Sequence, residues 1–164
     1  MVRLRMQTLT AIVEIPRGSR SKYEIDKKTG RLFLDRVVST AFGYPTNYGF
    51  IENTLALDGD PIDALILVQN QLFPGVALHI RPVGVLHMTD DGGEDDKVLC
   101  VALKDPYCDH INDLDDVPKH VLNQIEHFFQ HYKDLEEGKW VKLGAWNGKD
   151  KAIEIITEGL SRFN

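Results

Sequence analysis

An acidic turn leads into an apolar strand in the stretch Leu57-Asp58-Gly59-Asp60-Pro61-Ile62-Asp63-Ala64. Its three carboxylates repel one another unless a cation or solvent compensates their charge. Aspartate, glycine and proline are also ordinary turn residues, so a solvated acidic turn is one interpretation and a divalent-cation site is the other. An EF-hand calcium loop fits poorly, because Pro61 and Ile62 interrupt its ligand pattern and Gln69 stands where its bidentate glutamate belongs.

A second acidic run follows, Met88-Thr89-Asp90-Asp91-Gly92-Gly93-Glu94-Asp95-Asp96-Lys97. Taken alone, it is typical of a hydrated hairpin loop. It also lies between two predicted strands, however, and antiparallel strands can bring two such loops to one mouth of a barrel. Together the two runs indicate one site with hard oxygen ligands, which suits magnesium or manganese.

The first two-thirds of the chain predict short strands separated by turns. The turn Lys27-Lys28-Thr29-Gly30 suggests a hairpin, and Pro82 marks a bulge or an edge within its strand. Many short strands at this spacing predict a small closed or nearly closed barrel. The expected strands are residues 10–15, 22–26, 32–38, 64–68, 77–85 and 98–103.

Two helices are predicted after these strands. The first begins at Asp116 or Val117, with Asp116 as the cap and Pro118 in the first turn. The second covers residues 150–162. Both are expected to cover the barrel with one apolar face, formed by Val121, Ile125, Phe128 and Tyr132 in the first helix and by Ile153, Ile156 and Leu160 in the second.

The composition is that of one globular domain, residues 1–164, with 43% hydrophobic residues and a formal net charge of −6. An acidic surface disfavours nonspecific binding to nucleic acid or to an anionic membrane. No apolar run is long enough to cross a bilayer, and the segment 1–8 has no apolar signal stretch, so we expect a cytoplasmic protein. Cys100 and Cys108 form no metal-binding pattern, and Cys100 is predicted to be a buried thiol.

A phosphate substrate would also need cations. Lys22, Arg36 and Lys97 lie in or beside predicted strands, and Lys133 ends the first helix. Each alone is typical of a solvated surface charge, but a guanidinium such as that of Arg36 can hold phosphate oxygens in a bidentate grip. The aromatic segment 42–50 is either a packed corner or a support that aims a phenol at phosphate.

Three histidines, His120, His127 and His131, share the face of the first helix opposite its apolar stripe. His127 and His131 have the spacing of a zinc pair, but Phe128 replaces the glutamate of a zinc protease. A free surface and an oligomer contact are both open interpretations.

The ordered set of segments resembles the family I soluble inorganic pyrophosphatases in their short bacterial form. The resemblance runs from residue 13 to the second helix, and Asp91 and Asp96 are small departures at positions that are not matched ligands. It rests on Lys22-Tyr23-Glu24-Ile25-Asp26, Asp35-Arg36, Tyr44-Pro45-x-x-Tyr48-Gly49, Asp58-Gly59-Asp60-Pro61-x-Asp63, Arg81-Pro82-Val83-Gly84 and His131-Tyr132-Lys133-Asp134-Leu135-Glu136.

This resemblance implies an α+β, mainly β fold: a five-stranded, closed β-barrel like the oligonucleotide-binding fold, flanked by two α-helices. Asp60 matches the residue that takes a proton from the nucleophilic water. Metal ligands and nearby acids match Asp58, Asp63, Asp90, Asp95, Glu24 and Glu14, for Mg²⁺ or alternatively Mn²⁺. Groups that hold the phosphoryl ends match Lys22, Arg36, Tyr48, Lys97, Tyr132 and Lys133.

We therefore expect pyrophosphate to be hydrolysed to two phosphates by direct attack of a metal-activated water, without a covalent intermediate. The resemblance also implies a homohexamer built from two trimers, with the histidine face at an interface, and we expect its assembly to be sensitive to acid. Three rivals remain open: a barrel that binds oligonucleotides without catalysis, a metal phosphohydrolase acting on nucleotides, and a calcium-binding structural protein.

Overall fold

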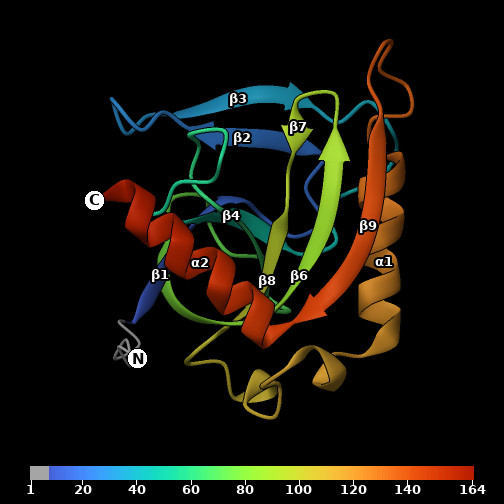
Figure 1. Ribbon diagram of the computed structural model, residues 1–164. Helices are drawn as coiled ribbons and strands as arrows, with labels where there is room; N and C mark the ends of the chain where they lie inside the picture. Colours follow the sequence, from blue (N-terminus) through green and yellow to red (C-terminus); the bar gives the residue numbers. More distant parts are fainter. Residues whose placement is uncertain (1–7) are drawn as a thin grey trace.

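The computed structural model describes residues 8–164, and the expectation about a signal segment lies almost wholly outside them. The chain is mainly β, with two α-helices packed against a curved sheet (Figure 1). The strands are β1 (Leu9–Ile15), β2 (Ser21–Ile25), β3 (Leu32–Val37), β4 (Asn47–Ile51), β5 (Asp63–Leu67), β6 (Ala77–Asp90), β7 (Gly93–Glu94), β8 (Lys97–Ala102) and β9 (Val141–Gly148). The helices are η1 (Pro106–Cys108), η2 (Leu114–Asp116), α1 (Lys119–His131) and α2 (Lys149–Phe163).

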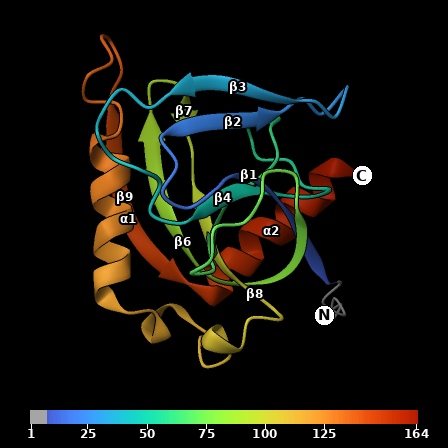
Figure 2. The ribbon, with the colours of Figure 1, turned by 180° about the vertical axis from the view of Figure 1, so that it is seen from behind.

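The main sheet pairs its strands in the order β1-β4-β5-β8-β6-β7, and a further pairing of β1 with β6 joins β1, β4, β5, β8 and β6 in a ring. β9 pairs with β6 outside this ring. Strands β2 and β3 form a separate two-stranded sheet, which lies above β4 in Figure 2.

Both faces of the ring strands are buried, because successive side chains point to opposite faces and each face meets a helix. On β5, Leu65 belongs to the apolar cluster that includes Ile125 and Phe129 of α1. Its neighbour Ile66 belongs to the cluster that includes Ile156 of α2. This explains why β5 and β8 consist almost entirely of apolar residues.

The predicted strands and the bulge at Pro82 are confirmed, since the β6–β8 register shifts between Pro82 and Gly84. Strand β6 runs on to Asp90, beyond the predicted end at residue 85. Three strands were missed: β4, within the segment interpreted as a corner, the two-residue β7, within the second acidic run, and β9, between the two helices.

The predicted start of the first helix was wrong. Helix α1 begins at Lys119 with Pro118 as its N-cap, and Asp116 instead closes a capping box with Asp113 around η2. An aspartate close to a helix can accept a hydrogen bond from the backbone N–H groups of either neighbouring turn, and here Asp116 accepts from the start of η2.

The predicted apolar face of the second helix is confirmed in part: Ile156 is buried and Leu160 packs against the same cluster, whereas Ile153 is only partly buried and lies outside it. Helix α2 covers Lys149–Phe163, close to the predicted range. Cys100 is fully buried, and burial raises the pKa of its thiol. No helix among residues 8–164 is both long enough and apolar enough to cross a bilayer.

Candidate active site

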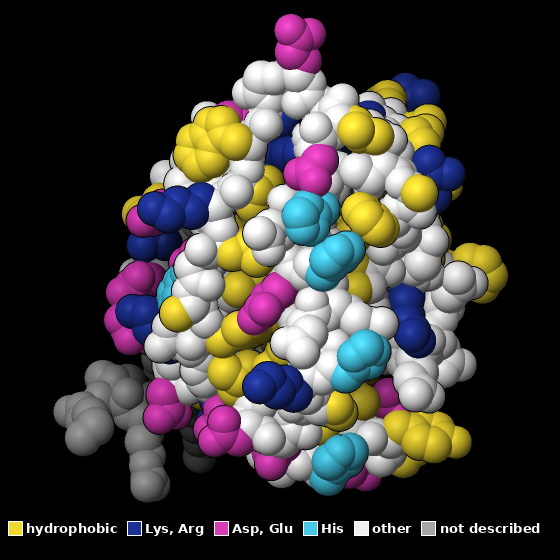
Figure 3. All heavy atoms as spheres, turned by 90° about the vertical axis from the view of Figure 1, so that its right-hand side faces the viewer, with side chains coloured by type: hydrophobic (Ala, Val, Ile, Leu, Met, Phe, Trp, Pro, Cys, Tyr) yellow, Lys and Arg dark blue, Asp and Glu magenta, His cyan; other side chains and the backbone are white. Residues whose placement is uncertain are grey.

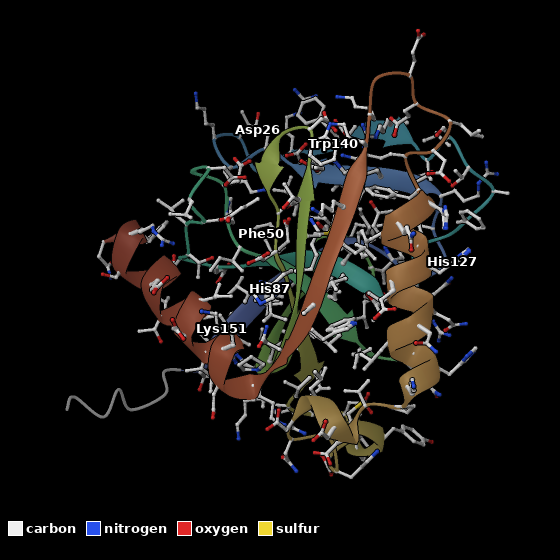
Figure 4. The ribbon with its side chains drawn as sticks, turned by 45° about the vertical axis from the view of Figure 1, so that its right-hand side comes forward. Asp26, Phe50, His87, His127, Trp140 and Lys151 are labelled. Atoms are coloured by element: carbon white, nitrogen blue, oxygen red, sulfur yellow. The ribbon has the colours of Figure 1, made fainter. Side chains whose placement is uncertain are left out.

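A cleft of about 1600 Å³ opens between the β2–β3 sheet, the ends of β5, β6 and β8, and helix α2. In Figure 4 the labelled residues Asp26, Phe50, His87 and Lys151 follow one another from top to bottom, and all of them line this cleft. Every predicted site residue lines the same cleft, including the predicted metal ligands of both acidic runs and all of the predicted cations and phenols.

The first acidic run forms a tight loop between β4 and β5. Gly59 has a φ of +86°, a conformation that glycine adopts without steric cost. The backbone N–H of Asp60 donates to Oδ1 of Asp58 over 3.0 Å, and the N–H of Ala56 donates to the carbonyl of Asp60 over 2.7 Å. Asp58 and Asp60 are consequently held near the tip of the loop with exposed carboxylates, while Asp63 begins β5.

The second acidic run forms the turn that reverses β6 into β7. Oδ1 of Asp90 accepts from the N–H of Gly92 over 2.8 Å, which closes this turn. The N–H of Asp95 donates to the carbonyl of Met88 over 2.9 Å, so Asp95 returns beside β6 directly before β8 begins. The prediction that the two acidic runs share one mouth of the sheet is confirmed.

Lys97 lies at the centre of these acids. Its Nζ is 2.8 Å from Oδ2 of Asp63 and 2.8 Å from Oδ2 of Asp95, and it donates to the hydroxyl of Tyr48 over 2.8 Å. Burial alone would lower the pKa of Lys97, but the adjacent carboxylates outweigh burial and hold this pKa well above its usual range. Burial raises the pKa of the Tyr48 phenol, which remains a neutral hydrogen-bonding group.

The β2–β3 sheet supplies the opposite wall of the cleft. Lys22 pairs with Asp35 over 3.2 Å, and Nη1 of Arg36 pairs with Glu136 over 3.1 Å. Glu24 is exposed on the same wall. The cations here are therefore held by one carboxylate each and remain partly accessible from the cleft.

Glu14 is a buried acid beneath this wall. Its Oε2 accepts from the N–H of Ile25 over 2.8 Å and pairs with Lys27 over 3.3 Å. Desolvation raises the pKa of Glu14, although the Ile25 N–H and the Lys27 ammonium oppose this shift. Lys27 also lies 4.2 Å from the ring centre of Phe50. Sequence reasoning did not identify Lys27 or Phe50 as site residues, because Lys27 was interpreted only as part of a hairpin turn and Phe50 only as part of the aromatic segment 42–50.

The last two predicted residues, Tyr132 and Lys133, directly follow the C-terminal end of α1. Lys133 pairs with Asp90 over 3.1 Å, and the Tyr132 ring packs against Phe128 and Phe129. Burial raises the pKa of the Tyr132 phenol. Asp91 and Asp96, which depart from the family pattern in the second acidic run, also have partners here. Asp91 pairs with Lys139, and Asp96 pairs with His87.

The donors around the cleft fit a hard divalent cation, because they are carboxylate oxygens with no thiol or imidazole among the predicted ligands. Within residues 8–164, no three histidine, cysteine, aspartate or glutamate side chains stand grouped as ligands of one ion. Asp63 and Asp95 instead share the Lys97 ammonium, which compensates part of their negative charge.

Comparisons with known proteins agree with this arrangement. The family model described as inorganic pyrophosphatase matches residues 11–164. An inorganic pyrophosphatase of Leifsonia xyli is 50% identical over 158 residues, which cover 96% of this chain and 97% of that protein. One of Corynebacterium efficiens is 50% identical over 151 residues, which cover 92% of this chain and 95% of that protein.

Solved structures give the same result. The crystal structure of the Thermus thermophilus inorganic pyrophosphatase superimposes with a TM-score of 0.93 at 44% identity, covering 99% of this chain and 95% of that chain. The Helicobacter pylori inorganic pyrophosphatase superimposes with a TM-score of 0.93 at 42% identity, covering 96% of this chain and 94% of that one. With these likenesses over nearly its whole length, the chain belongs to the inorganic pyrophosphatase family.

Proposed function

We propose that this cleft is the active site in which the chain hydrolyses inorganic pyrophosphate to two phosphates. One observation supports the proposal above all: the carboxylates of Asp58, Asp63 and Asp95 line a single cleft together with the cations Lys22 and Arg36. A substrate with several negative charges needs cations on one side and metal ligands on the other, because its charge otherwise repels an attacking water.

The acidic loops are proposed to hold Mg²⁺, or alternatively Mn²⁺. Asp58, Asp63 and Asp95 would hold the first ions, and Asp90 would join Asp95 in holding an ion that arrives with substrate. Glu14 and Glu24 would complete the acidic surroundings of the cavity. When bound, such ions lower the pKa of a coordinated water and neutralise charge on phosphate oxygens.

Asp60 is proposed to orient the attacking water and accept its proton. Its carboxylate is exposed to the cleft, and its own backbone N–H is tied to Asp58, so its position follows that of the metal-binding loop. A positioned carboxylate of this kind is a general base. The attack is proposed to be direct, because the cleft lining among residues 8–164 contains no serine or cysteine, and each lysine there is already paired with a carboxylate.

The remaining residues are proposed to hold the two phosphoryl groups. Arg36 pairs with Glu136 through Nη1, and the other N–H donors of its guanidinium remain available for phosphate oxygens. The phenols remain neutral near pH 7, so they donate hydrogen bonds rather than repel phosphate. The proposed set is Lys22, Arg36, Tyr48, Lys97, Tyr132 and Lys133.

The experiment that tests this function measures phosphate release from pyrophosphate by the purified protein with Mg²⁺, with Mn²⁺, with Ca²⁺ and with a chelator. We expect release with Mg²⁺ that the chelator abolishes. ATP serves as a parallel substrate, and faster release from ATP than from pyrophosphate would favour the nucleotide rival. No release with any ion would reject the proposal.

We also propose that the protein forms a homohexamer. Support comes from the exposed histidines that gather on the face shown in Figure 3, where α1 lies at the surface. A hollow of about 670 Å³ on this face is lined by His120, His127 and Phe42, and the His127 ring meets Phe42 edge-on at 5.2 Å. Light scattering at neutral pH should give six times the 18.6 kDa mass of the chain.

We further propose that the protein is a single domain, that its ring of strands is a closed barrel, and that it is located in the cytoplasm. The ring of β1, β4, β5, β8 and β6 supports a closed barrel like the oligonucleotide-binding fold. The family match over residues 11–164 supports a single domain for 1–164. Cys100 and Cys108 are free thiols, which suits a reducing cytoplasm, and fractionation followed by immunoblotting would test that location.

A further inference from the structure

The last turns of α2 hold the loop that carries Asp58 and Asp60. In both Figure 1 and Figure 2 the C-terminal end of α2 lies beside the loop between β4 and β5. The N–H of Leu55 donates to the carbonyl of Gly159 over 3.0 Å, and Nη1 of Arg162 donates to the carbonyl of Leu55 over 3.2 Å. Both backbone polar groups of Leu55 are therefore bonded to this helix.

The same helix also contacts the other end of the loop. Ile62 is 3% exposed, and its side chain lies against Gly159 so closely that a Cβ on residue 159 would meet Cδ1 of Ile62 at 2.4 Å. The same Cβ would lie 3.2 Å from the carbonyl oxygen of Leu55. Glycine costs stability inside a helix, so its presence here reflects the space that the two loop ends require.

The loop between these ends is cross-linked internally. Oγ1 of Thr54 accepts from the N–H of Ile62 over 3.1 Å and donates to the carbonyl of Ile51 over 2.7 Å. Among residues 8–164, no ion pair involves Asp58 or Asp60. With no external partner for these carboxylates, their position follows from where α2 holds the ends of the loop.

We propose that Gly159 and Arg162 are positioning residues that set the geometry of Asp58 and Asp60 through Leu55 and Ile62. The proposal rests on the proposed function only for the role of this loop as a metal ligand. Supporting residues behind metal ligands affect affinity because a ligand that is free to move must be ordered when the ion binds.

The first test uses a steric substitution and its compensation. Gly159→Ala should weaken binding of Mn²⁺ roughly tenfold, measured by titration calorimetry without substrate. Ile62→Val removes the Cδ1 atom that alanine would meet. The double variant should therefore regain the affinity of Ile62→Val alone. Alanine favours the helix, so a thermal midpoint that does not fall would separate displacement of the loop from unfolding.

The second test removes the hydrogen bond to the loop. Arg162→Met should also weaken Mn²⁺ binding, whereas Lys151→Met is the matched control. Lys151 lies on the same helix and lines the same cleft, but its ion pair is with Glu154 of α2. The control thus separates loss of the hydrogen bond from loss of one positive charge.

Asp58→Asn should abolish the binding of an Mn²⁺ ion that is held by this loop. The variant therefore shows whether the measured ion is bound there. Unchanged affinity in both Gly159→Ala and Arg162→Met, with binding that still depends on Asp58, would overturn the proposal. So would a double variant as weak as Gly159→Ala. If the wild type binds Mn²⁺ but releases no phosphate from pyrophosphate, the proposed function fails while these affinities still test the positioning role.

Discussion

The ammonium nitrogen of Lys97 lies 2.8 Å from Oδ2 of Asp63, where the parallel strands β5 and β8 pair these two residues with each other. The contact therefore follows from the sheet register. A slip of one residue would turn the Lys97 side chain to the other face of the sheet and leave both Asp63 and Asp95 without a cation. The fold and the charge balance of the cleft thus depend on the same strand pairing.

Replacing Lys97 by methionine should destabilise the protein by about 3–5 kcal/mol in chelator, because it leaves two carboxylates beside each other without their buried partner. Saturating Mg²⁺ should restore part of the lost free energy of unfolding, because ions that bind the carboxylates of the folded protein stabilise the folded state. Urea unfolding with and without Mg²⁺ measures both effects. Wild-type stability of Lys97→Met in chelator would contradict the prediction.

Asp60→Asn should keep Mn²⁺ binding and most of the free energy of unfolding while turnover falls roughly 10²- to 10⁴-fold, the contribution usual for a general base. The reason is that the amide keeps the shape of the carboxylate but cannot accept the proton. Steady-state phosphate release and titration calorimetry measure the two properties separately. Turnover close to that of the wild type would show that another group takes the proton.

Much of the fold could be predicted from the sequence because most strands are short apolar runs between turn residues. Strand β4 was missed because Asn47, Tyr48 and Gly49 have the composition of a turn. Gly49 is required there because a Cβ would meet the carbonyl oxygen of Ile12 at 1.8 Å. Strand β9 was missed because Gly144, Asn147 and Gly148 interrupt its apolar residues. Its place in the sheet depends on pairing with the distant strand β6.

The predicted site residues could be grouped by type and by the family resemblance, and all of them line one cleft. Their partners could not be predicted, because these partners come from distant parts of the chain. Glu136 reaches Arg36, and Lys27 reaches Glu14. The support of α2 for the acidic loop has no sequence signal either, since a single glycine in a helix has no distinctive pattern.

The histidine face predicts an assembly that dissociates as the pH falls from 7 to about 5. The rings of His127 and His131 lie 4.8 Å apart on this face, and Nδ1 of His131 lies 2.7 Å from Oδ2 of Asp134, so several pH-sensitive side chains stand together where we propose the interface. Light scattering across this range measures the mass of the assembly. His127→Gln should make the mass less dependent on pH, and one unchanged oligomer in the wild type from pH 7 to about 5 would contradict the prediction.

Asp113 links the η2 turn to the start of α2, and it predicts a pH-dependent contribution to stability. Its Oδ1 accepts from the N–H of Lys149 over 2.9 Å and from its neighbour Leu114 over 2.7 Å. These hydrogen bonds favour the ionised carboxylate and hold the pKa of Asp113 below its ordinary value of 3.8. The lowered pKa means that the stabilisation is complete above 3.8 and is lost as the pH falls through the pKa of the folded state.

Asp113→Asn keeps an oxygen acceptor but removes the charge. The variant should therefore be less stable than the wild type at neutral pH by an amount that stays constant down to about pH 4 and then shrinks. Urea unfolding from about pH 7 to pH 2 measures this difference, with Asp115→Asn in the same turn as the matched control. A difference that grows as the pH falls would mean that the charge at Asp113 does not stabilise the start of α2.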